Sequence, residues 1–526
     1  MAKELTDVLR DWEAVIGLEI HTEITAARTK MFCGCAVAFG GEPNTRVCPV
    51  CLGMPGALPV PNEAAVQWTV LAGLATGCAI APWSQFHRKN YFYPDMPKDY
   101  QISQYDKPFC ESGSVLIEVD EDGVAERVDR AQPDVADAGL QLAADGKTYA
   151  TTIGITRIHL EEDTGKMVHL GGSEGRIAGA VNSLVDFNRA GTPLMELVSE
   201  PDLRTPEEAR RFVQKLRLIW QAIGISDGNM EEGSMRVDAN VSVRRRGEVE
   251  FGTKAELKNM NSFKALHDGL VYEIVRQAAL LESGGRVVQE TRHWDATKKV
   301  TSALRSKEEA HDYRYFPEPD MVPFEFSSEY VQRIRERLPE LPDARRARYV
   351  RDWGLPTFDA AVLTADLELA AYFEEALELA GSRASELAAE VAKLLVNDLR
   401  AYLNAAGVGP VDSVVRPAGV VELVALVDGG TISGKQAKEV FAAMCGEAGA
   451  SPAEIVEKRG MRQLSDTSQL ATVIDGIVAA HPDKVEAYRG GKAGLIGFFV
   501  GQVMRETGGQ ANPQVVNELL QERLTP

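Results

Sequence analysis

The sequence is short of positive charge. It has 57 Lys and Arg against 77 Asp and Glu, which gives a net charge of −20 over 526 residues. A chain this acidic is not expected to bind nucleic acid or membranes unspecifically, although a local basic patch is compatible with it. Charged residues make up 25% and hydrophobic residues 44%, as in a soluble globular protein, and the length predicts two to four domains.

No stretch is typical of a membrane span or a secretory signal. Residues 64–86 carry no charge, but Gln, Gly, Thr and Pro interrupt them. We expect a buried helix over 62–76 instead, with Asn62 as its N-cap. The first residues lack a positive flank followed by an apolar core. The sequence therefore predicts a cytoplasmic protein with no membrane partner.

Cysteines are few, and their number is odd. Seven cysteines in a chain of this length argue against a disulfide framework. Four of them form a C-x-C pair and a C-x-x-C pair on either side of a short loop, namely Cys33, Cys35, Cys48 and Cys51. Four thiolates at this spacing are typical of a closed, structural zinc site. Four unpaired core cysteines are the alternative.

A standard phosphate-binding loop is also missing. Residues 429–436 satisfy the G-x-x-x-x-G-K pattern, but Gln436 stands where a hydroxyl group is needed to hold magnesium, and no βαβ unit surrounds the segment. We interpret it as a turn in which Ser433 caps the next helix. If the chain binds ATP, it does so at another site.

The sequence does contain a strand with unusual chemistry on one face. Residues 15–24 alternate, so that Glu19, His21 and Glu23 share the face opposite to the aliphatic side chains. Carboxylates this close repel one another unless a cation lies between them, and a metal ion is the simplest one. A solvated strand face with an acidic bias would give the same pattern.

Further strands of this kind are expected over 152–163, 194–198, 235–243 and 253–261. In the first, His159 and Glu161 lie on one face and Leu160 and Glu162 on the other. In the second, Glu196 is a lone acid in an apolar run, where a buried carboxylate without a partner is costly. The last places Lys254, Glu256 and Lys258 on one face. Together these side chains suit a metal ion and phosphate groups.

Helices and loops complete the predicted fold. A helix over 206–223 begins with a capping box and packs on the sheet. The aromatic, base-rich segments 87–104 and 312–320 show neither a helical nor a strand period and suit contacts with anions or nucleotides. Residues 120–150 are typical of an acidic surface insertion. Helical spacing dominates from about residue 330. The expected fold class is α+β, an antiparallel-sheet domain followed by all-helical C-terminal domains.

Six strings point to one family. They are VIGLEIH (15–21), RKNYFYPD (88–95), YQISQ (100–104), GTPLME (191–196), GTKAELKN (252–259) and DYRYFPEPD (312–320). With them, the chain closely resembles the B subunits of the glutamine-dependent aspartyl/glutamyl-tRNA(Asn/Gln) amidotransferases, from about residue 13 to the C-terminus.

The resemblance implies a domain plan and a reaction. It implies a cradle-shaped catalytic domain over 1–305 with a zinc knuckle at 33–51, a linker and helical segment over 306–375, and a tRNA-binding helical tail over 376–526. ATP would phosphorylate the side-chain carboxylate of misacylated Glu-tRNA(Gln) and/or Asp-tRNA(Asn), and ammonia would then displace the phosphate. The partners implied are amidotransferase subunits A and C in a heterotrimer, where the former is a glutaminase that supplies the ammonia and the latter holds the other two together. Such an enzyme is a carbon–nitrogen ligase with glutamine as amido donor.

The resemblance also implies site residues. The implied magnesium ligands are Glu19, His21, Glu162 and Glu196. Contacts with phosphate, nucleotide or the ammonia channel are implied for Lys89, Tyr91, Arg236, Lys254, Lys258 and Asn259. The four cysteines correspond to a zinc knuckle that some members have and others lack. Phosphorylation gives the carboxylate a better leaving group, and magnesium with Lys and Arg stabilises the charge on the phosphate. His is an unusual magnesium ligand, so His21 could instead hold a water molecule or transfer a proton.

Two other functions compete with this one. The chain could be a non-catalytic RNA-binding scaffold, but its acid-rich strand faces would repel RNA phosphates. It could also be a metal-dependent phosphohydrolase, which would turn over ATP without tRNA.

Overall fold

The computed structural model describes residues 4–119, 141–142 (backbone only), 148–171, 179–304, 313–446, 449–463, 467–508 and 511–525. The chain divides into two compact units, Met1–Leu341 and Pro342–Pro526. The predicted insertion at 120–150 lies largely outside the described residues. Among the described helices, none combines the length and the apolar character needed to cross a membrane.

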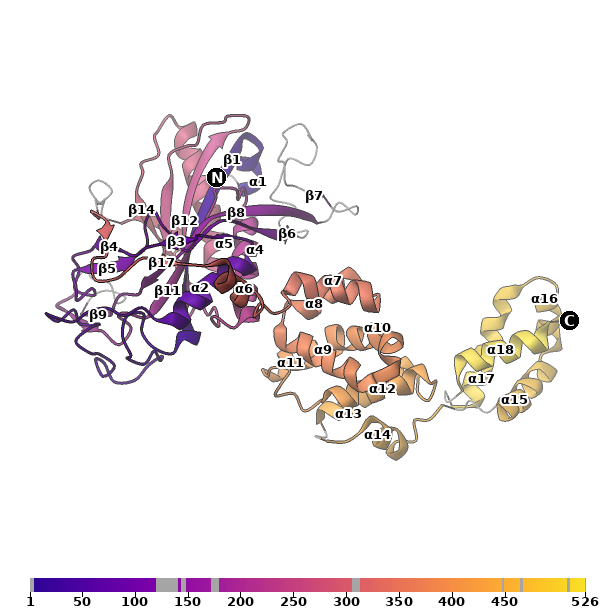
Figure 1. Cartoon of the computed structure of the whole chain (residues 1–526). Coiled ribbons are helices and arrows are strands. Elements are labelled where there is room, and N and C mark those ends of the chain that lie inside the picture. Colours follow the sequence, from indigo (N-terminus) through magenta and orange to yellow (C-terminus); the bar gives the residue numbers. More distant parts are fainter. Residues whose placement is uncertain are drawn as a thin grey trace. The chain divides into compact units, whose positions relative to one another are not determined.

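A large mixed sheet dominates the first unit (Figure 1). Its strand order is β15-β14-β13-β12-β1-β11-β8-β6-β2, with β7 pairing beside β8. The strands are β1 (Trp12–Glu23), β2 (Ala79–Ile80), β6 (Cys110–Val119), β7 (Gln141–Leu142), β8 (Tyr149–Glu162), β11 (Pro193–Ser199), β12 (Met235–Arg245), β13 (Ala255–Lys258), β14 (Thr291–Asp295) and β15 (Val300–Ala303). All neighbours along this order pair antiparallel except β13 and β14. The α+β fold class is confirmed, and β1 is a central strand.

Helices cover the apolar face of this sheet. They are α1 (Leu5–Asp11), α2 (Glu63–Ala75), α4 (Pro206–Ile223) and α5 (Phe263–Glu282). The predicted caps are present: Asn62 accepts a hydrogen bond from the Ala65 amide, and Thr205 forms a capping box with Glu208. The aliphatic face of β1 and the apolar stripe of α4 belong to one hydrophobic core. With one face packed in this way, the opposite face of the sheet is available for polar side chains.

The aromatic segments pair with each other over a long sequence separation. Strands β4 (His87–Asn90) and β5 (Tyr100–Ser103) form a hairpin, and β16 (Phe316–Pro317) pairs with β4. Beside them β17 (Phe324–Glu325) pairs with β3 (Trp83–Ser84). The prediction that 87–104 lacks strand structure is therefore wrong, because strands of four residues are too short to show a period. These pairings also place 316–325 in the first unit, so the division falls later than residue 305.

The remaining elements of the first unit are short. Strands β9 (Lys166–Leu170) and β10 (Asn182–Asp186) form a separate pair, and α6 (Ser328–Arg335) packs on α2.

The second unit is helical, with α7 (Pro342–Trp353), α8 (Thr357–Thr364), α9 (Leu367–Ala380), α10 (Ala384–Leu394), a π-helical turn (Leu395–Leu399), α11 (Arg400–Ala406), α12 (Pro417–Asp428), α13 (Gly434–Gly446), α14 (Pro452–Lys458), α15 (Thr467–Ala480), α16 (Pro482–Arg489), α17 (Ile496–Glu506) and α18 (Pro513–Leu524).

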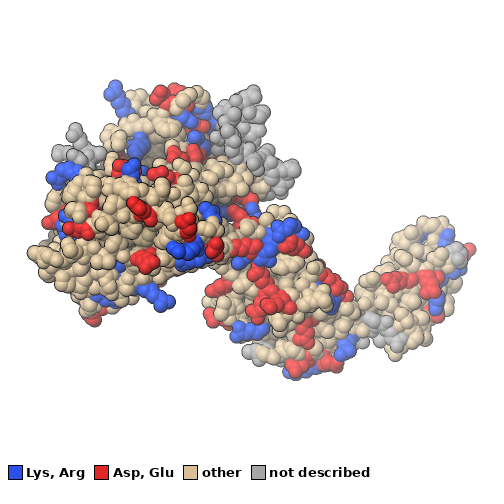
Figure 2. All heavy atoms as spheres, in the orientation of Figure 1, with Lys and Arg blue, Asp and Glu red and all other residues tan. Residues whose placement is uncertain are grey.

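Two separate hydrophobic clusters lie in the second unit, one within 349–456 and one within 470–524. Residues 429–433 form a turn, α13 begins at Gly434, and the Ser433 hydroxyl accepts a hydrogen bond from the Gln436 amide at 3.3 Å, as predicted. Acidic and basic side chains are interspersed on the visible face of both units (Figure 2).

Candidate functional site

The polar face of the sheet carries a row of ionisable side chains from four strands. In β1 the aliphatic residues are fully buried, and Glu19, His21 and Glu23 point to the other face, as predicted. His21 stands opposite Glu196 of β11 and Arg236 of β12, and Glu196 stands opposite His159 of β8. Directly opposed residues share a face and lie close together. The register therefore lines up His159, Glu196, His21 and Arg236 across the sheet.

Glu196 is held between two imidazoles. Its Oε2 atom lies 3.1 Å from Nε2 of His21 and 3.4 Å from Nε2 of His159. The same His159 nitrogen lies 3.6 Å from Oε2 of Glu161, which also accepts a hydrogen bond from the Ser103 hydroxyl at 2.8 Å. Strands β1, β8 and β11 thus contribute to one cluster of two carboxylates and two imidazoles, in which His21 is half-buried and the other three side chains are buried.

The pKa values in this cluster follow from its charges. Burial opposes ionisation of Glu196, but the two imidazoles hold its pKa well below the usual value. Burial likewise disfavours a charged imidazole at His159, but the charge of Glu196 and the hydrogen bonds to both carboxylates raise its pKa to about 9. The pKa of His21 is raised against burial in the same way. Protons on the imidazoles therefore balance the carboxylates when no other cation does.

The cluster has the donor set of a divalent metal site. One ligand atom each from His21, Glu161 and Glu196 lies within 4.8 Å of the others. Two carboxylates leave coordination positions for water and phosphate oxygens, which is how proteins hold Mg²⁺ at phosphoryl-transfer sites, and His21 would be an unusual third ligand. The residues therefore fit the predicted ion, with Glu161 in the place predicted for Glu162.

Glu162 lies on the opposite face of β8. Its carboxylate forms an ion pair with the Lys98 ammonium and accepts a hydrogen bond from the Ile102 amide at 2.9 Å. Both side chains of this ion pair are buried. The structure therefore does not bring Glu162 together with His21 and Glu196. Sequence reasoning missed Glu161 and His159 as site residues, although the alternation of β8 showed that these two share a face.

A second acidic group lies beside the first. Ligand atoms of Glu19, Asp238 and Glu256 are within 4.8 Å of one another. The Lys258 ammonium lies 2.8 Å from Asp238 and 2.9 Å from Glu256, and Asn240 donates to Glu19 at 3.1 Å. Burial and the charge of Glu196 raise the pKa of Glu19, so Glu19 is close enough to the first cluster to feel its charge. Glu19, predicted to share an ion with His21 and Glu196, thus groups with Asp238 and Glu256 instead, and Lys258 is engaged by two of these carboxylates.

Lys89 and Tyr91, both predicted to contact phosphate or nucleotide, have different surroundings. Burial opposes the charge of Lys89, but Glu161, Tyr315 and Glu196 together raise its pKa, and its ammonium lies 5.0 Å from the Tyr313 ring centroid. Lys89 is therefore close enough to the carboxylate cluster to feel its charge. The Tyr91 ring packs beside Tyr93, with centroids 5.8 Å apart.

Three predicted residues lie away from these carboxylates or are already engaged. Arg236 forms an ion pair with Asp163 at 3.0 Å. Asn259 has a left-handed backbone conformation that ends β13, and its side chain donates to the Trp294 carbonyl at 3.1 Å. Lys254 is exposed and precedes β13, and within the described part of the chain it has no ion-pair or hydrogen-bond partner. The strand expected over 253–261 is therefore shorter in the structure, where β13 contains only Ala255–Lys258.

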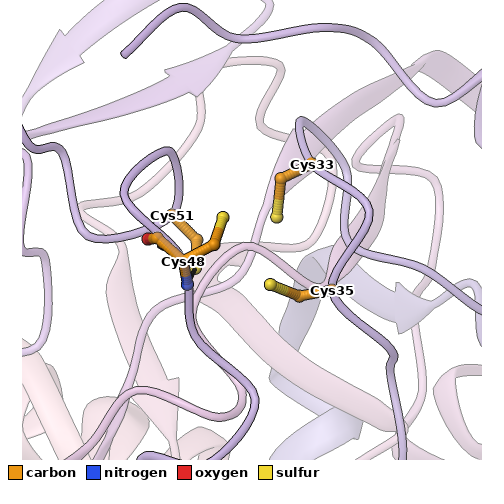
Figure 3. Close-up of side chains that lie close together, drawn as sticks. All are labelled: Cys33, Cys35, Cys48 and Cys51. Carbon is orange, nitrogen blue, oxygen red and sulfur yellow. Dashed lines mark hydrogen bonds between the residues drawn. The ribbon is translucent and has the colours of Figure 1, made fainter. Parts of the chain in front are cut away.

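The four predicted cysteines converge from two loops (Figure 3). Their sulfur atoms all lie within 4.8 Å of one another, and a tetrahedral zinc site with bonds of about 2.3 Å needs separations of roughly 3.8 Å. A hydrogen bond from Cys33 lowers the pKa of Cys51 to about 4 and raises that of Cys33. Cys51 Sγ also accepts from the Cys48 amide at 3.2 Å and from the Lys30 ammonium at 3.5 Å. The donor set fits a soft divalent metal such as zinc.

Comparison with known proteins defines the class. Residues 14–332 match the profile of the GatB/GatE catalytic domain, and residues 371–524 match that of the GatB domain. The chain belongs to this family. The sheet with the ionisable row thus lies within the part that matches a catalytic domain.

Particular relatives resemble the chain over nearly its full length. It is 50% identical over 516 residues to the B subunit of the aspartyl/glutamyl-tRNA(Asn/Gln) amidotransferase of Carboxydothermus hydrogenoformans, covering 98% of this chain and 99% of the relative. It is 50% identical over 514 residues to the protein of the same name from Moorella thermoacetica, covering 98% and 100%. The protein of that name from Halorhodospira halophila is 50% identical over 515 residues, covering 98% and 99%.

Proposed function

We propose that this chain is the component of a glutamine-dependent tRNA amidotransferase that activates and amidates misacylated tRNA. ATP phosphorylates the side-chain carboxylate of Glu-tRNA(Gln), Asp-tRNA(Asn) or both, and ammonia replaces the phosphate. The observation that carries the proposal is the cluster of His21, Glu161 and Glu196, which adjoins Lys89 on the polar face of the catalytic-domain sheet. Full-length similarity to proteins named as the B subunits of such enzymes supports it.

The chain's own residues supply binding and charge. His21, Glu161 and Glu196 would hold Mg²⁺, with Glu19 at the rim of the same face. When bound, the ion would stabilise the negative charge that develops on the phosphate. Lys89, on β4, feels the charge of these carboxylates and would neutralise a phosphate oxygen. Because Glu161, Glu196 and His159 are buried and His21 is half-buried, water is partly excluded and these electrostatic contacts are strong.

The zinc site has a structural role in this proposal. Cys33, Cys35, Cys48 and Cys51 use all four coordination positions, so no position is open for substrate. When bound, zinc would cross-link the two loops that follow β1.

Partners follow from the reaction. We propose a heterotrimer with a glutaminase, which supplies ammonia, and a small third protein that holds the other two together. The helices of the second unit, α15–α18 above all, are proposed to bind the tRNA. A protein that acts on aminoacyl-tRNA works where translation takes place, which agrees with the cytoplasmic location expected from the sequence.

A transamidation assay tests the proposal. The chain is co-expressed with the glutaminase and the small third protein, and the complex receives misacylated tRNA, ATP, Mg²⁺ and glutamine. We expect Gln-tRNA(Gln) or Asn-tRNA(Asn), with ATP consumption that depends on the tRNA. The variant Glu196→Gln should abolish the product and the tRNA-dependent ATP consumption, while tRNA binding persists. ATP turnover of equal rate without tRNA would favour a phosphohydrolase, and tRNA binding without any transamidation would favour a scaffold.

A further inference from the structure

Lys30 is a lysine with no access to solvent. Its exposed fraction is 0%, and it is among the largest fully buried side chains of the described residues. The ammonium donates hydrogen bonds to two atoms, the Phe187 carbonyl oxygen at 3.0 Å and Cys51 Sγ at 3.5 Å. A buried ammonium is costly unless an opposite charge lies beside it. The structure must therefore provide a counter-charge for Lys30.

No carboxylate of the described residues provides it. Among the residues that the structure describes, none offers a carboxylate oxygen within ion-pair distance of Lys30. Lys98 lines the same cavity as Lys30 and shows the contrast, because it is also buried but forms an ion pair with Glu162. The backbone carbonyl carries only a partial charge. Of the two hydrogen-bond acceptors of the ammonium, only Cys51 Sγ can carry a full negative charge, as a thiolate.

The charge of a four-cysteine metal centre matches this need. Four thiolates and one divalent ion give a net charge of −2, which is itself costly where Cys51 is buried. An adjacent ammonium reduces that charge to −1, and it orients the sulfur through a hydrogen bond. We propose that Lys30 is a built-in part of the metal centre, the positioning residue whose ammonium neutralises the tetrathiolate and helps to retain the ion. This inference rests on the proposed metal binding by the four cysteines.

Lys30 also joins the metal centre to the turn that leads into the sheet. Besides the bond to Phe187, the Met31 amide donates to the Gly191 carbonyl at 2.6 Å. Gly191 has a φ of 86°, and a Cβ atom there would lie 3.4 Å from the Lys30 side chain and 3.7 Å from Cys51. The turn therefore packs directly on the stem of Lys30. Two residues later β11 begins, the strand that carries Glu196.

A double-mutant cycle on the full-length chain tests the role of Lys30. The variant Lys30→Met removes the charge and keeps the length of the side chain, and Lys30→Arg keeps the charge. The second background is Cys33→Ser/Cys35→Ser, which removes two ligands but leaves the contact residue Cys51. The readouts are zinc content after purification, the rate of zinc release to a chromophoric chelator, and the melting temperature.

In the four-cysteine background we expect Lys30→Met to release zinc at least about 10-fold faster, as for other groups that hydrogen-bond to metal ligands. Lys30→Arg should retain zinc better than Lys30→Met. In the Cys33→Ser/Cys35→Ser background, Lys30→Met should no longer lower the melting temperature, because no tetrathiolate metal centre is left whose charge the ammonium could neutralise. If Lys30→Met does not fold with four cysteines but folds in the second background, the inference is also supported.

Two outcomes would overturn it. The first is unchanged zinc release in Lys30→Met, and the second is an equal loss of melting temperature in both backgrounds, which would assign Lys30 to the Phe187 contact alone. A wild-type chain purified without zinc, and unable to take it up, would instead refute the proposed metal binding itself. Failure of the inference about Lys30 and failure of the proposed metal binding therefore give different results.

Discussion

Glu161 and Glu162 are neighbours in β8 with opposite surroundings, and replacing each by Gln tests the site directly. Glu161 lies with His159 and Glu196 on the polar face, whereas Glu162 pairs with Lys98 on the other. Both replacements keep the shape and a hydrogen-bond acceptor for Ser103 or Ile102. They remove a negative charge from two different places, so their effects should separate.

The expected magnitudes follow from these contacts. Glu161→Gln removes one of the two carboxylates that we propose as metal ligands. Since even groups that only hydrogen-bond to ligands contribute about 10- to 100-fold to metal affinity, Mn²⁺ binding should weaken by about 100-fold or more. Glu162→Gln leaves the buried Lys98 ammonium unpaired, and breaking a buried ion pair in this way costs about 3–5 kcal/mol. Mn²⁺ affinity should then stay within about threefold of wild type while the chain becomes less stable.

The measurements are Mn²⁺ titration followed by electron paramagnetic resonance, and urea unfolding of the same samples. The matched control is Lys98→Met/Glu162→Gln, which removes both partners of the ion pair and should recover part of the lost stability. The reasoning is refuted if Glu162→Gln abolishes Mn²⁺ binding while Glu161→Gln preserves it. That result would restore the ligand set expected from the sequence.

Three further predictions concern stability. Without divalent metal, the pKa of His159, about 9 in the folded chain against 6.5 for a free side chain, contributes about 3 kcal/mol below pH 6.5 that is lost as the pH rises through 9. Urea unfolding across this range should show that loss in wild type and much less of it in Glu196→Gln, and parallel curves would contradict the assignment. Removal of zinc with a chelator should lower the melting temperature of wild type but not of Cys33→Ser/Cys35→Ser, and equal shifts in both would argue against a structural zinc. Thr205→Ala should reduce the unfolding free energy by about 1 kcal/mol through loss of the α4 cap, with Thr205→Ser near wild type, and an unchanged value for the Ala variant would count against the capping box.

The sequence by itself determined features that depend on neighbours along the chain. The alternation of residues 15–24 specified which side chains of β1 share a face, because the side-chain period of a strand is two. The caps at Asn62 and Thr205 use groups within three residues, so their residue types were sufficient to locate both helix starts. The spacing of the four cysteines likewise predicted their convergence, which Figure 3 shows.

The tertiary structure decided what depends on pairing across the chain. Alternation separated Glu161 from Glu162, but only the register of β11 against β8, with Glu196 opposite His159, put Glu161 on the side of His21. A register shifted by one residue would have exchanged the two acids, and long-range pairing rather than local pattern sets the register. The short strands around Lys89 and the contact of Lys30 with Cys51 likewise join distant segments. These pairings and contacts are stabilised by packing and charge between segments that meet only in the folded chain, so the local sequence pattern does not predict them.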